Sequence, residues 1–343
     1  MSLRRIFLPA LVLFVLTMTA SSQDLGFEAV FPNPRFGAFG DSLLYDSGPS
    51  APVSEPWDTV LFQGRGAGAQ ARFEVSRSGP GEAENWVEAD VTRYPNGRFW
   101  GRTRLEPRPG GVRIRVLGGG SVRDALEIYS VELFLSEPIA ASTPGADGEK
   151  AESPDRPYVF GRDFWRAKPP KEPYTPHRPW RITIHHTAGL RPRTLPESID
   201  ELRFTQDFHQ NGRGWSDIAY HFLIDPMGRI FRGRPEDVEG AHTAENNPGN
   251  IGIALLGHYH PPKNHEVSPE ALAALSALAL HLGRRYRVDS SKLMGHRDYR
   301  PTSCPGDGAY GLIEILRKEW PASPPLSLMP LPSLKLAADW YSR

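Results

Sequence analysis

The stretch Ile182-Thr183-Ile184-His185-His186-Thr187-Ala188-Gly189 joins an apolar, β-branched run to two adjacent histidines. Such a run favours a buried β-strand, and successive side chains of a strand point to opposite faces of the sheet. His185 and His186 therefore cannot both reach one metal ion. His186 shares a face with Ile182 and Ile184, whereas His185 lies on the other face. Parity alone leaves either histidine as a candidate ligand.

Two further candidate ligands, His296 and Cys304, lie in the segment Gly295-His296-Arg297-Asp298-Tyr299-Arg300-Pro301-Thr302-Ser303-Cys304-Pro305-Gly306. A loop of this length that contains a proline can bend two side chains towards one point. Catalytic zinc usually takes three protein ligands and keeps one position open, whereas structural zinc is closed by four. Because Cys304 is the only cysteine, a cysteine-rich structural site is excluded. Taken singly, histidines at a strand end are more often structural. The combination predicts a hydrolytic zinc site.

The sequence around these residues predicts a mixed α/β fold, with a mixed central β-sheet flanked by helices, between residues 158 and 320. The near-continuous apolar run 251–256 predicts a central strand buried on both faces. Ser268-Pro269-Glu270 has the N-cap, first-turn proline and acidic residue that open a helix. The remaining patterns predict strands over 181–185, 219–224 and 229–232 and helices over 196–210, 269–286 and 308–320.

Residues 25–135 predict an all-β sandwich that precedes this region. Apolar and charged residues alternate over 71–75 and 112–116, and glycine- and proline-containing turns separate the predicted strands. The role of this domain is open. An exposed aromatic such as Trp100 could bind wall polysaccharide, although an aromatic residue on a strand is more often part of a core.

The chain ends predict export. Arg4-Arg5, the apolar run 6–18 and Ala20-Ser21-Ser22 have the order of a secretory signal peptide over 1–22. The run is shorter than the ~20 residues of a membrane-spanning helix, and an uncleaved anchor is the alternative. Residues 136–157 predict a linker, and 321–343 a Pro-rich tail. We therefore expect a secreted or periplasmic protein of the cell envelope.

Charge limits the class of partner. The chain has 40 Lys and Arg and 40 Asp and Glu, so the sequence predicts no nucleic-acid partner. No other apolar stretch is long enough to cross a bilayer, so we expect no stable membrane insertion after signal removal, and a monomer. A lone thiol in an exported protein would be exposed to oxidation unless it were held, which favours metal ligation of Cys304.

Several motifs between residues 158 and 320 occur together and in one order. They resemble the zinc amidase superfamily that includes peptidoglycan recognition proteins and phage lysozyme-type amidases. The matching segments are 162–169, 182–189, Phe208-His209 with 214–220, Gly240-Ala241-His242, Asn250-Ile251-Gly252-Ile253 and 295–306.

The resemblance implies the site and the activity. It makes His185 rather than His186 the zinc ligand, with His296 and Cys304, and it places the catalytic tyrosine at Tyr220 and a polar catalytic residue at Thr302. The implied activity is N-acetylmuramoyl-L-alanine amidase, which cuts the bond between the lactyl group of muramic acid and the stem peptide. Zinc would supply hydroxide near neutral pH, and the two hydroxyls would stabilise the developing charge. Without the resemblance, Tyr220 is as readily a core tyrosine.

Two positions depart from the family pattern. Ala254 stands where cytoplasmic relatives carry a catalytic glutamate, and Pro235-Glu236 stands where some recognition proteins have a Gly-Trp pair. The third residue of the preferred stem peptide is therefore undetermined. Two alternatives to the amidase are a non-catalytic protein that binds peptidoglycan or muropeptides, and a zinc peptidase that cuts within the stem.

Overall fold

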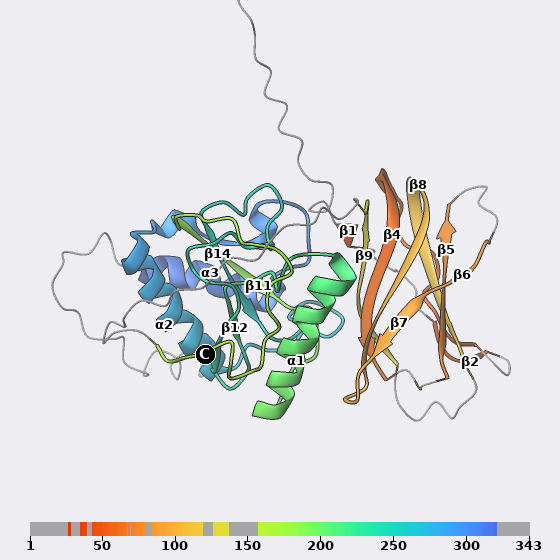
Figure 1. Ribbon diagram of the computed structural model, residues 1–343, viewed down its shortest axis with the longest axis horizontal. Helices are drawn as coiled ribbons and strands as arrows, with labels where there is room; N and C mark the ends of the chain where they lie inside the picture. Colours follow the sequence, from red (N-terminus) through yellow and green to blue (C-terminus); the bar gives the residue numbers. More distant parts are fainter. Residues whose placement is uncertain are drawn as a thin grey trace, which may run out of the picture.

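The computed structural model describes residues 43–320 except 67, 69, 80–83, 119–125 and 137–156, together with the backbone of Phe27–Glu28 and Arg35–Phe39. The predicted signal peptide, residues 137–156 of the predicted linker and the predicted tail lie outside the described residues. An N-terminal β-structure and a C-terminal α/β-structure lie side by side, and helix α1 (Leu195–Asp207) runs along the boundary between them (Figure 1).

The N-terminal half is built from strands linked through the long strand β8 (Arg98–Leu117). The first part of β8 pairs with β4 and β7, and its last part pairs with β3 and β5. The other strands are β1 (Phe27–Glu28), β2 (Arg35–Phe39), β3 (Leu43–Asp46), β4 (Val53–Arg65), β5 (Arg72–Ser78), β6 (Val87–Glu88), β7 (Asp90–Arg93) and β9 (Glu127–Phe134).

Successive side chains along these strands point to opposite faces of the sheet, so the N-terminal half has two different faces. Alternate residues such as Val60 and Phe62 of β4 and Val131 and Leu133 of β9 are buried in one apolar core with Phe73 and other residues of β5 and β8. The intervening residues of β4 and β9 point the opposite way, towards the C-terminal half. The period-2 pattern thus produces the predicted all-β layer structure.

The C-terminal half contains a six-stranded mixed sheet with the order β10-β13-β12-β14-β11-β15. Its strands are β10 (Val159–Phe160), β11 (Arg181–His186), β12 (Phe222–Ile224), β13 (Ile230–Arg232), β14 (Asn250–Leu255) and β15 (Leu293–Gly295). Strand β14 is buried throughout and pairs in parallel with β11 and β12, as its apolar run predicts. The mixed α/β fold class is confirmed.

Helices cover this sheet. Besides α1 they are the π-helix η2 (Phe208–Arg213), α2 (Pro269–Tyr286), α3 (Asp307–Glu319) and the short 3-10 turns η3 (Ser290–Lys292) and η4 (His296–Asp298). Helix α2 begins as predicted, because the Ser268 hydroxyl accepts a hydrogen bond from the Ala271 backbone N–H at 3.3 Å. Its buried face includes Leu275, Leu278 and Leu282, which pack on the sheet core. None of the helices in the described part of the chain combines the length and hydrophobicity needed to cross a membrane.

Two local predictions differ from the structure, and the structure decides between the two interpretations of Trp100. The predicted helix 196–210 changes from α- to π-helical geometry after Asp207, and the wider turn runs to Arg213. The predicted strand 219–224 begins only at Phe222. Trp100 is 8% exposed and packs with Phe204 and Phe208 of the C-terminal half, so the core interpretation of Trp100 is confirmed and the sugar-binding alternative is wrong.

Candidate metal centre and substrate pocket

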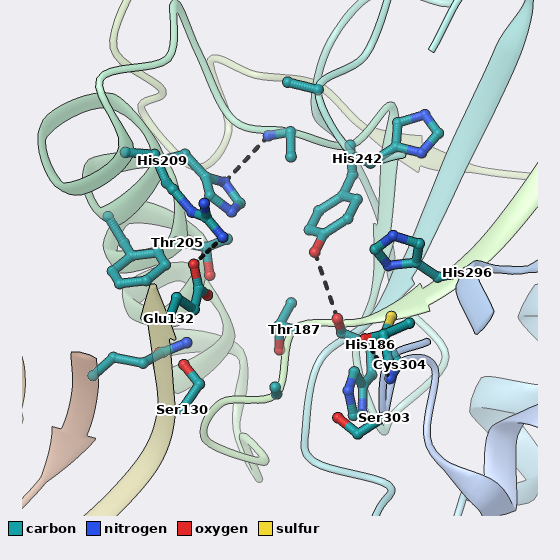
Figure 2. Close-up of a pocket in the computed structure, with 18 of the residues that line it drawn as sticks. Ser130, Glu132, His186, Thr187, Thr205, His209, His242, His296, Ser303 and Cys304 are labelled. Atoms are coloured by element: carbon teal, nitrogen blue, oxygen red, sulfur yellow. Dashed lines mark hydrogen bonds and ion pairs between the residues drawn. The ribbon is translucent and has the colours of Figure 1, made fainter. Parts of the chain in front are cut away.

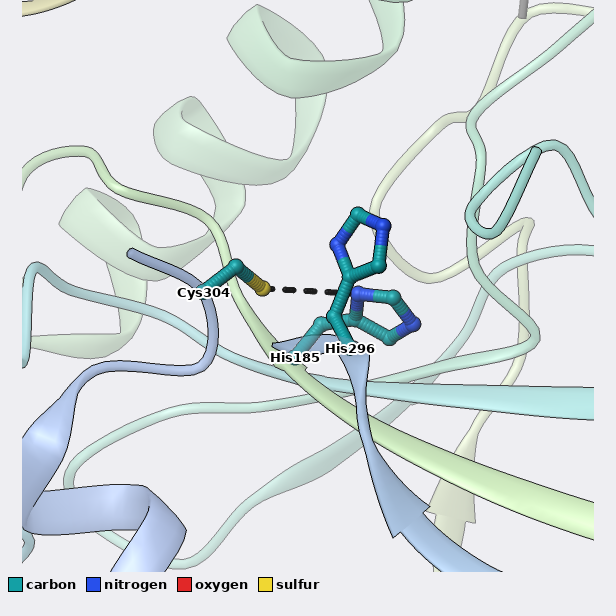
Figure 3. A group of neighbouring side chains, drawn as sticks. All are labelled: His185, His296 and Cys304. Atoms are coloured by element: carbon teal, nitrogen blue, oxygen red, sulfur yellow. Dashed lines mark hydrogen bonds between the residues drawn. The ribbon is translucent and has the colours of Figure 1, made fainter. Parts of the chain in front are cut away.

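Strand order brings the distant histidines together. Strands β11 and β15 are parallel neighbours, and Ile184 lies opposite Gly295. The residues that follow them, His185 and His296, therefore lie side by side at the same end of the sheet. Cys304 reaches this edge from the loop that precedes α3. One ligand atom from each of the three residues lies within 4.8 Å of the others (Figure 3). The carboxyl ends of parallel strands are where open α/β sheets usually place their sites.

The structure separates the two adjacent histidines. The Nδ1 atom of His185 lies 3.5 Å from the Cys304 Sγ atom. His186 points the other way: its Nδ1 accepts a hydrogen bond from the Tyr259 backbone N–H at 3.2 Å, and its ring lies 5.4 Å from that of His258. Of the two candidates that parity left open, only His185 faces Cys304 and His296.

A chain of hydrogen bonds fixes the tautomer of His185. The Asn250 carbonyl can only accept, so the His242 Nε2, at 3.1 Å, must donate to it. The Nδ1 of neutral His242 is then an acceptor, which the His185 Nε2 at 3.0 Å and the Thr243 hydroxyl at 2.9 Å approach as donors. The remaining His185 nitrogen, Nδ1, keeps its lone pair and faces Cys304. Such an outer partner orients a metal-binding imidazole.

Two glycines make room for His242. A Cβ atom at Gly252 would lie 2.6 Å from the His242 Cδ2 atom, and one at Gly240 would lie 2.3 Å from the same atom. Contacts this short would displace the ring and break its hydrogen bond to His185. The glycines of the motifs Gly240-Ala241-His242 and Asn250-Ile251-Gly252 therefore have a steric reason.

Burial keeps the site histidines neutral. It holds the pKa of His185 well below its ordinary value, and the neighbouring His296 adds to the effect. Burial, followed by the positive charge of Arg300, lowers the pKa of His296 to about 4. The His296 Nε2 atom is buried and has no hydrogen-bond partner. Neutral imidazoles and a cysteine sulfur form a donor set that fits zinc, which such ligands bind in their deprotonated forms.

Tyr220 and Thr302 both line the pocket beside these ligands. The Tyr220 hydroxyl lies 3.5 Å from the His186 carbonyl oxygen. Burial, then the charge of Cys304, raises the pKa of Tyr220 above its ordinary value, so the phenol stays protonated and can donate. The Thr302 hydroxyl accepts a hydrogen bond from the Cys304 backbone N–H at 3.2 Å and retains its own proton. Both hydroxyls can thus donate to a group bound in the pocket.

The pocket, of about 170 Å³, has a second wall opposite the ligands. This wall includes His209 of the π-helix and Ser130 and Glu132 of β9 (Figure 2). Arg213 of the π-helix also lines the pocket and pairs with Glu132. Sequence reasoning missed Ser130, Glu132 and Arg213. The alternation of β9 makes Ser130 and Glu132 resemble solvent-facing polar residues, and only the packing of the two halves turns them towards the pocket.

Other residues singled out by the sequence lie elsewhere. Ala254 is buried on β14 directly opposite His185, so no carboxylate enters the site there. Glu236 accepts a hydrogen bond from the Tyr286 hydroxyl at 2.8 Å and pairs with Arg232. The His258–His265 loop adds no further group of three metal-binding side chains within the described residues.

Comparisons with known proteins agree with these observations. Residues 175–307 match the family model described as N-acetylmuramoyl-L-alanine amidase. The chain is 34% identical to peptidoglycan-recognition protein LB of Drosophila melanogaster over 167 residues, which cover 48% of this chain and 68% of that protein. It is 33% identical to peptidoglycan recognition protein 1 of Mus musculus over 160 residues, which cover 46% of this chain and 86% of that protein.

Among solved structures, wild-type Drosophila PGRP-LB is 31% identical and matches 50% of this chain and 98% of its own, with a TM-score of 0.43. The sequence matches to the family model and to the two curated relatives fall on the half that carries His185, His296 and Cys304. The chain belongs to the superfamily of type-2 N-acetylmuramoyl-L-alanine amidases and peptidoglycan recognition proteins.

Proposed function

We propose that this protein is a secreted or periplasmic, zinc-dependent N-acetylmuramoyl-L-alanine amidase. Its substrate is peptidoglycan or a muropeptide, and the bond that it hydrolyses joins the lactyl group of muramic acid to L-alanine. The observation that carries the proposal is the convergence of His185, His296 and Cys304 at one edge of the sheet. The family membership supports the substrate class.

The donor set and its surroundings support zinc as the metal. His185 Nδ1, a nitrogen of His296 and the Cys304 sulfur would hold the ion, and three protein ligands leave a fourth position open. Zinc in such a site lowers the pKa of water to about 7 and polarises a carbonyl oxygen. The tautomer set by His242 keeps the His185 lone pair directed at Cys304.

The hydroxyls of the pocket would act on the scissile amide. Because its pKa is raised, Tyr220 keeps its proton and donates a hydrogen bond to the carbonyl oxygen as negative charge develops there. Thr302 donates a second hydrogen bond, and its hydroxyl is positioned by the hydrogen bond that it accepts from the Cys304 N–H. With alanine at position 254, no carboxylate on that strand takes a proton from the attacking water.

The test is product analysis with purified protein and isolated cell walls. We expect one zinc ion per chain, and release of stem peptides with new N-terminal alanine, detected by mass spectrometry. Cys304→Ala should lose both the bound zinc and the activity, whereas His260→Ala, a histidine outside the pocket, should keep both.

Other outcomes point elsewhere. New N-termini further along the stem would indicate a peptidase. Muropeptide binding without turnover by the zinc-loaded protein would indicate a recognition protein, and full activity of Cys304→Ala would overturn the proposed mechanism.

A further inference from the structure

The two halves of the molecule are joined by a buried ion pair. The Arg98 Nε atom of β8 lies 2.9 Å from the Glu201 carboxylate of α1, and both side chains are fully buried. Arg98 also donates to the Gly64 carbonyl at 2.8 Å and to the Gln63 side chain at 2.7 Å. A buried ion pair is stable only when its remaining polar atoms also have hydrogen-bond partners. Separating the pair would leave two charges without compensation. The halves are therefore fixed relative to each other.

An apolar cluster extends this contact. Leu61, Trp100 and Phe134 of the N-terminal sheet pack against Phe204 and Phe208 of α1 and the π-helix. The Trp100 indole N–H donates to the Asp207 carboxylate at 3.2 Å, and the Tyr94 hydroxyl donates to the same carboxylate. Alternation then turns Ser130 and Glu132 to the same side as Phe134, which is the side of the pocket.

This part of the pocket holds polar groups without partners. Ser130 is 9% exposed, and its hydroxyl, like the indole N–H of Trp215, is buried without a hydrogen-bond partner. Both residues line the pocket. Buried polar atoms are rarely left unpaired in folded proteins, and such atoms at a pocket wall are suited to a ligand.

A cationic group lies beside them. Arg213 forms an ion pair with Glu132, and its guanidinium lies 4.9 Å from the Phe134 ring centre and 5.0 Å from that of Trp215. The two aromatic rings and Glu132 hold the guanidinium at the pocket wall. An arginine side chain has five N–H donors, which is more than a single carboxylate oxygen can accept. The planar fork of these donors fits the geometry of a carboxylate.

We propose that the N-terminal sheet forms one wall of the substrate site, where Ser130 and the Arg213 held by Glu132 bind a carboxylate-bearing stem peptide. The identity of the ligand rests on the proposed function. Ser130 supplies a hydrogen bond to the peptide, and Arg213 pairs with a free carboxylate of the stem. The N-terminal half is thus part of the site rather than a separate module for attachment to the wall.

Binding to the metal-free full chain tests this wall independently of catalysis. Calorimetry would compare an N-acetylmuramoyl tripeptide that has free stem carboxyls with the same compound in which they are amidated. We expect the wild type to prefer the free acid. Arg213→Gln should weaken acid binding about 10- to 100-fold and abolish the preference, and Ser130→Ala should weaken both ligands about 3- to 10-fold.

Matched controls keep the result specific. Arg72→Gln and Ser54→Ala change the same residue types at exposed positions of the N-terminal sheet and should leave both affinities unchanged. If Arg213→Gln fails to fold, Ser130→Ala, which removes one unpaired hydroxyl, still tests the wall.

The outcomes separate the two proposals. Equal affinity of the wild type for acid and amide overturns the role of Arg213, and wild-type affinity of Ser130→Ala overturns the wall. If Arg213→Gln and Ser130→Ala hydrolyse the substrate and bind both ligands as the wild type does, only the proposal of a substrate-binding wall is overturned. If the wild type prefers the acid but the zinc-loaded protein does not hydrolyse it, only the amidase proposal is overturned. If neither ligand binds, both proposals are overturned.

Discussion

The two walls of the pocket are built in different ways. The wall with the candidate metal ligands, or metal wall, comes from the C-terminal half alone, where adjacent parallel strands deliver His185 and His296 and a nearby loop adds Cys304. The opposite wall is shared, because Ser130 and Glu132 come from β9 and Arg213 from the π-helix. The first wall follows from local motifs within one sheet, whereas the second exists only because two separately built halves pack together.

The contact that creates the shared wall also carries the largest expected effect. Glu201→Ala should destabilise the protein by about 3–5 kcal/mol, because it leaves the Arg98 guanidinium buried and unpaired. Urea-induced unfolding measures the change. Asp200→Ala, on the exposed side of α1, is the control and should be close to neutral. A loss below about 1 kcal/mol for Glu201→Ala would show that the halves separate easily and that the shared wall is not fixed.

On the metal wall, the comparable test is Tyr220→Phe. Removing one donor to the developing oxyanion should lower kcat about 10²- to 10³-fold. The zinc content and the unfolding midpoint should stay unchanged, because the described partner of this hydroxyl is a single carbonyl at 3.5 Å. Tyr158→Phe, at an exposed tyrosine, should behave as wild type. Wild-type kcat in Tyr220→Phe would remove this residue from the reaction.

A smaller effect is expected at His242, which lies behind the candidate metal ligand His185. His242→Ala removes the acceptor for the His185 Nε2–H, so the ring loses the partner that sets its tautomer. Zinc affinity should fall about 10- to 100-fold, as for other outer-shell partners. Competition with a chromogenic chelator gives the affinity, and His260→Ala serves as the control. Unchanged affinity would mean that β11 alone orients His185.

The sequence predicted the metal wall better than the shared wall for a physical reason. Strand β14 and helix α2 follow from periodicity and capping, which act over a few residues. The convergence of His185, His296 and Cys304 was expected from motif order, but parity could not choose between His185 and His186. That choice depends on strand register, which pairs Ile184 with Gly295.

Helix α1 shows what local patterns could not reveal. Its sequence has a weak apolar stripe, and Glu201 and Asp207 are buried although they are acidic. They are buried because the N-terminal sheet covers the face that a lone domain would leave in water, and Arg98 and Trp100 supply their partners. Nothing within the helix encodes those partners, which lie about a hundred positions earlier in the chain. The same reasoning explains why the sequence left both a core role and a sugar-binding role open for Trp100, which the helix of the other half covers.

The position of Arg98 at the start of β8 has a consequence for the history of this chain. Because Arg98 pairs with Glu201 on a helix of the other half, neither half can be replaced without regard to the other. Recombination that exchanged either half for that of a relative would need matching changes at Glu201, Phe204 and Asp207 to avoid a stranded charge. A chimera whose C-terminal half lacks these partners should accordingly unfold at a lower urea concentration than this chain.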